Sequence, residues 1–301
     1  MPDWKIIVLV VVAIVGSTSC ELYNPEEQIP AYIQIDSFKV VDNLNAIEGS
    51  LSHDIRDAWV YVDDQPIGVY QLPAKFPVLA SNGTHKLTIG PGIYVSLSSG
   101  LRDNYLYYNA HIDKAFELTS GKTIQLTPIT SYRDPNDLYT YVLSEDFENI
   151  YSEADTFNNS DVALTITRDS SLVYEGTGSG IVKLSSDKQR VYVKTPSVEI
   201  PNGSKNVFFE FDFFTDYFVD VGLHINNDQT QDQNISILTL KPTTDGEGEK
   251  PWKKAYVGLD ASIDLATNPF DYYIYFNVLE AENSIGSGKF MLDNFKFCYS
   301  K

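Results

Sequence analysis

The chain has 301 residues, of which 43% are hydrophobic and 21% are charged, and its formal net charge is −19. This length is enough for two domains with separate cores, and the composition argues against both a disordered chain and an integral membrane protein. The acidic balance argues against nucleic acid as a partner and against adsorption to anionic lipid by charge alone, because both require a basic surface.

The first twenty residues are typical of an export signal that ends in a lipid attachment site. Residues 6–15 are ten apolar residues in a row, which is too short for a membrane-spanning helix of about 20 residues and fits the roughly 7–15 residues of a signal-peptide core. Four small residues then precede Cys20. This arrangement resembles the lipobox of bacterial lipoproteins, although Ser17 stands where that family usually has Leu. The resemblance implies that residues 1–19 are removed and that Cys20 is acylated; an ordinary signal peptide cut after Ser19 is the alternative.

Residues 20–30 are interpreted as the lipidated cysteine followed by a polar, acidic tether that ends in proline. Ten extended residues reach roughly 33 Å, enough to hold a domain away from a membrane. The acidic residues Glu21, Glu26 and Glu27 resemble the segments that follow the acylated cysteine in surface-exported lipoproteins of the Bacteroidota type. That resemblance implies a lipid-anchored protein of the outer membrane, exposed at the cell surface.

Two β-sandwich domains are predicted after the tether, because apolar residues alternate with a period of two and Gly, Pro, Asn and Asp interrupt the pattern. The first is expected at residues 31–132, where residues 58–62 alternate between two faces before a turn at 63–66. The stretches VYVDDQPIGVYQLP and GTHKLTIGPGI, within residues 57–93, resemble the small PEGA-type, Ig-like sandwich of bacterial surface proteins. The resemblance implies a module that spaces or docks other domains.

The second domain is predicted at residues 143–301, after a polar linker at 133–142 that contains an Asp-Pro-Asn-Asp cluster. Four of its segments carry a further resemblance: DFE at 146–148, GTGSG at 176–180, WKKAYVGL at 252–259 and LDNF at 292–295. In this order they resemble the carbohydrate-binding-module jelly rolls with a galactose-binding-like fold. The expected fold class is therefore all-β, with two sandwiches of which the second is a jelly roll.

Little in the sequence suggests catalysis. The four His residues are too far apart to form a local metal motif, and no nucleophile elbow occurs. Residues 210–215 (EFDFFT) are similar to the E-x-D-x-x-E strand of retaining β-glucanases, in which side chains two residues apart lie about 6.6 Å apart on one face. Thr215 replaces the third carboxylate, so the acid/base role is vacant and no enzyme activity is predicted. Cys298 lies in an alternating strand and is predicted to be a small buried hydrophobic residue, not a nucleophile.

A glycan-binding face is expected on the outside of the second domain. If Phe209, Phe211 and Phe213 point into the core, the residues between them point outward, and three further strands follow the same rule. The predicted site comprises Glu210, Asp212, His224, Trp252, Tyr256, Tyr273, Tyr275 and Asn277. Flat rings can cover the apolar face of a sugar, while carboxylates and amides bind its hydroxyl groups. The alternative is that this face packs against the other domain or against a protein partner, or merely carries tyrosines because they favour strands.

Asp146, Glu148 and Asp293 form a second group of candidate residues, near the first and last strands of the predicted jelly roll. In the modules that this domain resembles, carboxylates and carbonyls at these positions hold a structural Ca²⁺, which needs roughly six to eight oxygen ligands. A structural calcium ion is therefore one expectation, and two exposed acidic strand ends are the alternative.

The sequence as a whole predicts a non-catalytic lipoprotein of the cell envelope that needs no cofactor and binds glycan through its C-terminal jelly roll. Its expected partners are the membrane, through the N-terminal lipid, and a glycan, but no nucleic acid. The alternative function is that of an accessory subunit in an outer-membrane secretion, motility or nutrient-uptake complex, in which the jelly roll contacts protein.

Overall fold

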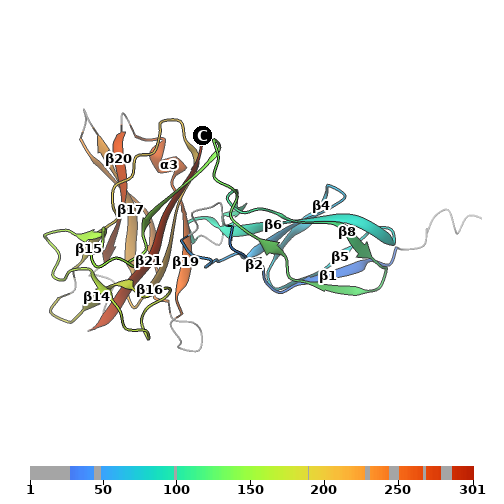
Figure 1. Cartoon of the computed structure of the whole chain (residues 1–301), viewed down its shortest axis with the longest axis horizontal. Coiled ribbons are helices and arrows are strands. Elements are labelled where there is room, and N and C mark those ends of the chain that lie inside the picture. Colours follow the sequence, from blue (N-terminus) through green and yellow to red (C-terminus); the bar gives the residue numbers. More distant parts are fainter. Residues whose placement is uncertain are drawn as a thin grey trace, which may run out of the picture.

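The computed structural model describes residues 28–43, 49–97, 100–188, 190–227, 231–243, 251–266, 269–278 and 287–301. It shows an all-β protein with two β-sandwich domains arranged end to end, which confirms the predicted fold class (Figure 1). Residues 1–27, which contain the predicted signal peptide, Cys20 and most of the tether, lie outside the described residues. Among the described residues, no helix is long and apolar enough to cross a membrane.

The N-terminal sandwich is built from strands on either side of an aliphatic and aromatic core. On one side β1 (Ala31–Ile35) lies between β5 (Ala74–Val78) and β9 (Thr123–Leu126), and β2 (Lys39–Val40) pairs with β10 (Ile129–Thr130). The other sheet has the order β4 (Gln65–Gln71), β3 (Asp57–Val62), β6 (Gly83–Tyr94) and β7 (Arg102–Asn104), with β8 (His111–Leu118) also paired to β6. The alternation is visible in β1, where Ala31, Ile33 and Ile35 are buried, whereas Tyr32 and Gln34 are only partly covered.

The C-terminal sandwich consists of two antiparallel sheets, which we call the inner and outer sheets. The inner sheet has the order β13 (Thr165–Thr167), β14 (Ser179–Leu184), β21 (Gly288–Ser300), β16 (Lys205–Thr215) and β19 (Lys253–Gly258), and β11 (Tyr139–Glu145) also pairs with β21. The outer sheet has the order β12 (Asp155–Thr156), β15 (Tyr192–Lys194), β20 (Pro269–Val278), β17 (Val219–Asn227) and β18 (Gln233–Leu240). The chain passes repeatedly from one sheet to the other, as in a jelly roll, and a short helix, α3 (Asp260–Ile263), follows β19.

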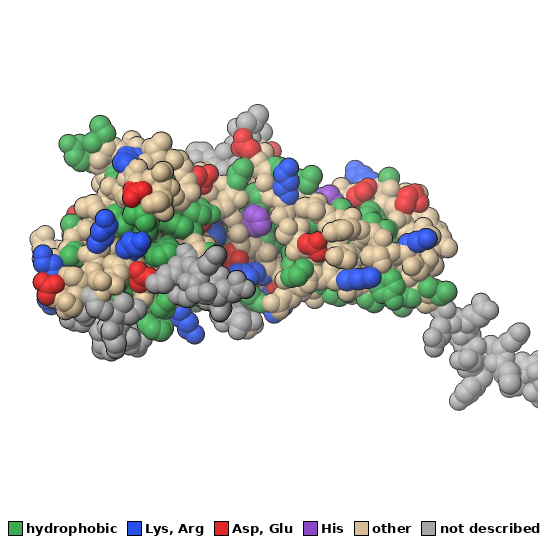
Figure 2. All heavy atoms as spheres, turned by 90° about the horizontal axis from the view of Figure 1, so that it is seen from below, with side chains coloured by type: hydrophobic (Ala, Val, Ile, Leu, Met, Phe, Trp, Pro, Cys, Tyr) green, Lys and Arg blue, Asp and Glu red, His purple; other side chains and the backbone are tan. Residues whose placement is uncertain are grey.

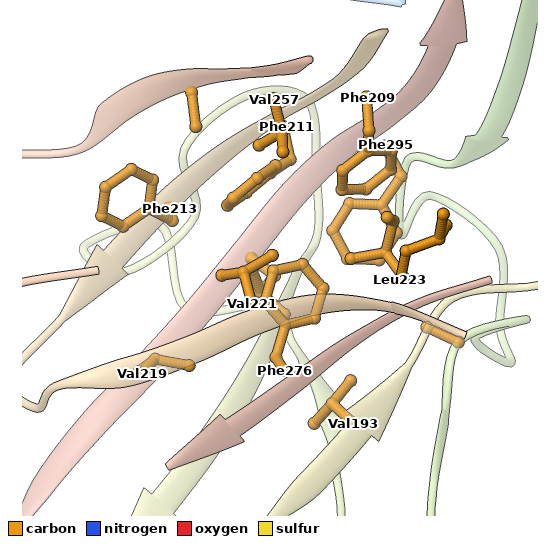
Figure 3. Packing of buried hydrophobic residues seen from close by; sticks show 14 of the residues in the cluster. Val193, Phe209, Phe211, Phe213, Val219, Val221, Leu223, Val257, Phe276 and Phe295 are labelled. Carbon is orange, nitrogen blue, oxygen red and sulfur yellow. The ribbon is translucent and has the colours of Figure 1, made fainter. Parts of the chain in front are cut away.

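An aromatic core fills the space between the inner and outer sheets (Figure 3). Phe209, Phe211 and Phe213 of β16 point into it, as the alternation predicted, and all are buried. The ring of Phe211 lies 5.2 Å from that of Phe209 and 5.2 Å from that of Phe276 on β20, measured between centroids. The two sheets are therefore joined through interlocking rings, and the opposite faces of β16 and β20 point away from this core.

The second domain begins earlier than the sequence predicted. Strand β11 starts at Tyr139 and pairs with β21, so residues 139–142 belong to the inner sheet and not to a linker. The remaining connection is held on both sides. The guanidinium of Arg133 donates a hydrogen bond to the carbonyl of Leu106 at 2.6 Å, and the side chain of Asn136 accepts one from the amide of Tyr139, the first residue of β11, at 3.1 Å. The connection between the domains is therefore anchored at several points.

Charge is spread over the surface of both domains. On the face shown in Figure 2, acidic and basic side chains alternate with exposed hydrophobic ones and do not gather in a single patch of one sign. On this face the described residues form no extended basic patch, in agreement with the net charge of −19.

Candidate functional site

The residues predicted to form one glycan-binding face lie on two different sheets, so the prediction of a single face was wrong. Glu210 and Asp212 on β16, Tyr256 on β19 and Trp252 just before β19 belong to the inner sheet, whereas His224 on β17 and Tyr273, Tyr275 and Asn277 on β20 belong to the outer sheet. Packed sheets lie roughly 10 Å apart with the core between them. The two groups therefore cannot contact one ligand.

Three of the four inner-sheet residues are covered by the N-terminal domain, whereas Trp252 is partly exposed and its ring packs 4.9 Å from that of Tyr174. Glu210 and Asp212 are completely buried, and Tyr256 is 1% exposed. The hydroxyl groups of Tyr105 and Tyr132, both from the N-terminal domain, donate hydrogen bonds to the Glu210 carboxylate at 2.5 and 2.6 Å. The alternative interpretation, in which this face packs against the other domain, is therefore correct for these residues. They are not available to bind a glycan.

Two buried lysines complete this interdomain cluster. The Nζ atom of Lys254 lies 3.4 Å from Glu210 Oε2 and 3.7 Å from Asp212 Oδ2, and Lys296 Nζ lies 3.3 Å from Glu210 Oε2. Lys296 Nζ also lies 3.5 Å from the centroid of the Tyr132 ring. Burial raises the pKa of Glu210, but the two ammonium groups and the tyrosine hydroxyls outweigh it and lower this pKa to about 2. The cluster thus keeps an ionised carboxylate inside the interface.

This burial has a direct consequence for the resemblance to the β-glucanase strand. Burial raises the pKa of Asp212, because the ammonium of Lys254 offsets only part of the desolvation. Its Oδ2 accepts hydrogen bonds from Ser52 Oγ at 2.8 Å and Asn294 Nδ2 at 3.0 Å. Neither carboxylate of the pair reaches solvent, so Glu210 and Asp212 act in domain packing. Cys298 lies in the same cluster and is buried, as predicted.

Two residues of the outer-sheet group, His224 and Tyr273, line a shallow groove on the surface. Two adjoining hollows, with volumes of about 540 and 330 Å³, are both lined by His224 and Tyr273. Lys194, Asn226 and Asp232 line the first, and Phe157, Tyr192 and Asn234 line the second. Because His224 and Tyr273 lie opposite each other on β17 and β20, they sit at the centre of this groove.

Aromatic rings pack in pairs along the groove. The imidazole of His224 stacks on the ring of Tyr273 with a centroid separation of 4.3 Å and an interplanar angle of 12°. Tyr192 stacks on Tyr275 at 5.4 Å. A Cβ atom at position 222 would lie 2.1 Å from the Tyr275 ring, so glycine at this position lets that ring lie across β17. Tyr275 is only 4% exposed, which means that it supports Tyr192 from below and is not itself a contact surface, contrary to the prediction.

Hydrogen bonds fix the polar side chains at the centre of the groove. His224 Nδ1 lies 2.7 Å from Asn234 Oδ1, and its Nε2 lies 3.0 Å from Asn226 Oδ1. Asn226 in turn donates to Asp271. The ammonium of Lys194 lies above the Phe157 ring, 5.3 Å from its centroid. The groove therefore presents flat rings beside amide, carboxylate and ammonium groups whose positions are already set.

The predicted residues His224, Tyr273 and Asn277 do lie on this sheet, but two rings that line the groove, Tyr192 and Phe157, were not predicted. Asn277 lies opposite Asp220 and Tyr192 on the neighbouring strands and is partly exposed. Tyr192 lies on β15, which has only three residues, and Phe157 directly follows β12, which has only two. Strands this short show no alternation that a period-two search could find.

The three carboxylates predicted to hold calcium have separate structural partners. Glu148 accepts hydrogen bonds from the amides of Thr177 and Gly178 at 2.8 and 3.1 Å, and Asp293 accepts one from Ser179 Oγ at 2.6 Å. Burial raises the pKa of Asp293 to about 8. In the part of the chain that the structure describes, no three His, Cys, Asp or Glu residues are grouped as a metal site requires. The predicted set of Asp146, Glu148 and Asp293 is therefore not assembled.

No protein-family model matches this chain, and no curated protein does. Solved structures of carbohydrate-binding modules are similar to part of it. The CBM22-1 xylan-binding domain of Paenibacillus barcinonensis Xyn10C is 11% identical with a TM-score of 0.39, over 56% of this chain and 99% of that one. The family 11 module of Clostridium thermocellum, in complex with a β-1,3-1,4-mixed-linked tetrasaccharide, is 16% identical with a TM-score of 0.35, over 54% of this chain and 96% of that one. These similarities concern the fold alone.

Proposed function

We propose that this protein is a non-catalytic glycan-binding lipoprotein of the cell envelope, which binds a sugar chain in the groove of the outer sheet. The observation that carries the proposal is the pair of adjoining hollows that share His224 and Tyr273 and combine exposed rings with fixed polar groups. Small-molecule sites in proteins are concave and combine apolar or aromatic walls with a few precisely placed polar groups.

The chemistry of a sugar ring matches this lining. A pyranose has an apolar face of C–H groups, which can stack on Tyr192, Tyr273 or His224, and a rim of hydroxyl groups that both donate and accept hydrogen bonds. Amide and carboxylate oxygens on Asn234 and Asp232 can accept from those hydroxyls. Two adjoining hollows favour a chain of sugar units over a single one.

The groove is also formed before any ligand arrives. His224 is held between two asparagines, and Tyr192 rests on the buried ring of Tyr275. Side chains that are already ordered lose little further entropy when a ligand binds, which leaves more of the contact energy for affinity.

Tyr273→Ala tests the groove. A glycan array identifies a ligand for the wild type, and calorimetry then compares affinities. We expect the variant to bind that ligand about 1–3 kcal/mol more weakly, the usual loss when an aromatic contact is removed from a binding site. Its unfolding midpoint should change little, because Tyr273 is partly exposed.

The matched control is Tyr61→Ala, a partly exposed tyrosine of the N-terminal domain, which should bind normally. An array without any ligand, or equal affinities for both variants, would contradict the proposal; a stoichiometric protein partner recovered instead would favour the accessory-subunit function.

Cys20→Ser tests the envelope location. The lipobox-like segment before Cys20 supports a lipid anchor, and the first described residues enter at the end of the N-terminal domain that is farthest from the C-terminal one (Figure 1). We expect the variant to leave the membrane fraction, because residues 6–15 are too short to span a bilayer core that needs about 20 residues. Retention of the variant in membranes after a high-salt wash would show that the lipid is not what holds the protein there.

A further inference from the structure

A separate hollow lies between the two domains, away from the groove, and residues of both C-terminal sheets line it. Its volume is about 370 Å³, within the range of roughly 300–1,000 Å³ that is typical of small-molecule sites. The N-terminal domain contributes Arg56, Tyr94 and Leu97 to its lining, and the C-terminal domain contributes Lys241, Lys253 and Lys254. We call this hollow the interdomain cleft.

The charge of the interdomain cleft is opposite to that of the whole protein. Four of its nine lining residues are basic and one is acidic, in a chain whose net charge is −19. Arg56 Nε pairs with Asp54 Oδ1 at 2.6 Å, and Lys254 belongs to the buried cluster around Glu210. Lys241 and Lys253 are exposed, and within the described ranges neither has a carboxylate at ion-pair distance. Two exposed ammonium groups in a lining with a basic majority thus point to an anionic ligand.

Tyr94 and Leu97 supply a ring and an apolar side chain to the lining, and Tyr94 is held in place. Arg102 Nη2 donates a hydrogen bond to the Tyr94 hydroxyl at 3.0 Å, and its guanidinium lies 5.1 Å from the centroid of the Tyr94 ring. After Tyr94 the chain forms a short turn, η1 (Val95–Leu97), which contacts β18 and β19. Ser96 and Leu97 both have left-handed backbone angles, with φ of 54° and 57°. Non-glycine residues in this region are strained, and such strain concentrates at ligand sites.

From these features we infer that the interdomain cleft binds a carboxylate-bearing saccharide, that is, a uronic acid unit. Lys241 and Lys253 can pair with its carboxylate, and Tyr94 with Leu97 can cover the C–H face of its ring. A ring face beside a charge distinguishes this ligand from a small inorganic anion. The inference concerns a second site and does not depend on the groove of the outer sheet.

Calorimetric titrations with trigalacturonate and with neutral galactotriose test the cleft, because these probes share a ring and differ in their carboxylates. We expect trigalacturonate to bind the wild type, and binding to weaken as salt rises from about 20 to about 200 mM. Lys241→Gln/Lys253→Gln should weaken it by at least about tenfold. The matched control, Lys114→Gln/Lys122→Gln, removes two exposed lysines from the N-terminal domain and should bind as the wild type does. Galactotriose should show no difference among the three proteins.

Tyr273→Ala separates this site from the groove. It should leave trigalacturonate binding unchanged if the cleft is the site. Loss of binding in Tyr273→Ala but not in the lysine pair would place the uronate in the groove and overturn the inference, while the proposed function would stand. Absence of trigalacturonate binding, equal losses in both lysine pairs, or complete competition by an equal concentration of inorganic sulfate would also overturn it.

Discussion

Glu210→Ala should lower the free energy of unfolding by about 3–5 kcal/mol, the usual result of removing one partner from a buried ion pair. The substitution removes the carboxylate that Lys254 and Lys296 both contact at 3.4 and 3.3 Å. It also removes the acceptor for the hydroxyl groups of Tyr105 and Tyr132. Because these four groups come from both domains, the loss falls on the interface between them.

Urea unfolding of the full chain, followed by circular dichroism, measures this change. The control is Glu199→Ala, an exposed glutamate of the same domain, which should change stability by less than about 0.5 kcal/mol. Glu210→Gln should fall between the two, because an amide can still accept from the tyrosines but carries no charge. A loss below about 1 kcal/mol in Glu210→Ala would show that the buried cluster contributes little net stability.

The free energy of unfolding, measured as the pH is lowered, provides a second test of the same cluster. The pKa of Glu210 is lowered from 4.5 to about 2 in the fold, so the folded state holds this proton less tightly than the unfolded state does. The stabilisation from Glu210 is therefore complete above the unfolded pKa and is lost as the pH falls from about 4.5 towards 2. Glu210→Gln should show a smaller loss of stability over this interval than the wild type.

Phe211→Ala should destabilise the C-terminal domain by about 3–5 kcal/mol, because it removes a fully buried ring and leaves a cavity. Phe211 packs against Phe209 and Phe213 on its own strand and against Phe276 of the outer sheet (Figure 3). Phe270→Ala is the matched control, because Phe270 is 59% exposed at the start of β20. Thermal unfolding of both variants tests the prediction, and similar midpoints for the two would mean that the core can collapse around the missing ring.

The alternation along β16 shows what could be predicted from the sequence and what could not. A period of two is a local property, so the inward direction of the phenylalanines and the outward direction of Glu210 and Asp212 follow from the sequence alone. The partner strands are a non-local property. Glu210 lies opposite Lys296 on β21, and Asp212 lies opposite Lys254 on β19. Without this strand order, an outward carboxylate could not be distinguished from an exposed one.

One short segment of the sequence is typical of a domain interface. Residues 105–108 read YLYY, and three of these four residues are tyrosines that the structure buries. A cluster of rings with hydroxyl groups in a connecting segment is typical of an interface, where the rings pack and the hydroxyls need polar partners. Tyr107 donates to the carbonyl of Asn206 at 2.6 Å, and Tyr108 lies 3.1 Å from the Tyr256 hydroxyl. The carboxylates and lysines of the inner sheet supply the other half of this interface.

The buried interface also determines how a surface-anchored copy would search its surroundings. If the two domains move as one body and Cys20 carries the proposed lipid, the reach of residues 20–30, roughly 33 Å when extended, limits how far the groove can move from the membrane. The groove of each copy would then stay within a narrow range of heights above the membrane, set by the length of its N-terminal domain. This confinement raises the local concentration of grooves around one polymer, so a chain with repeated units would be retained by avidity even when each groove binds weakly.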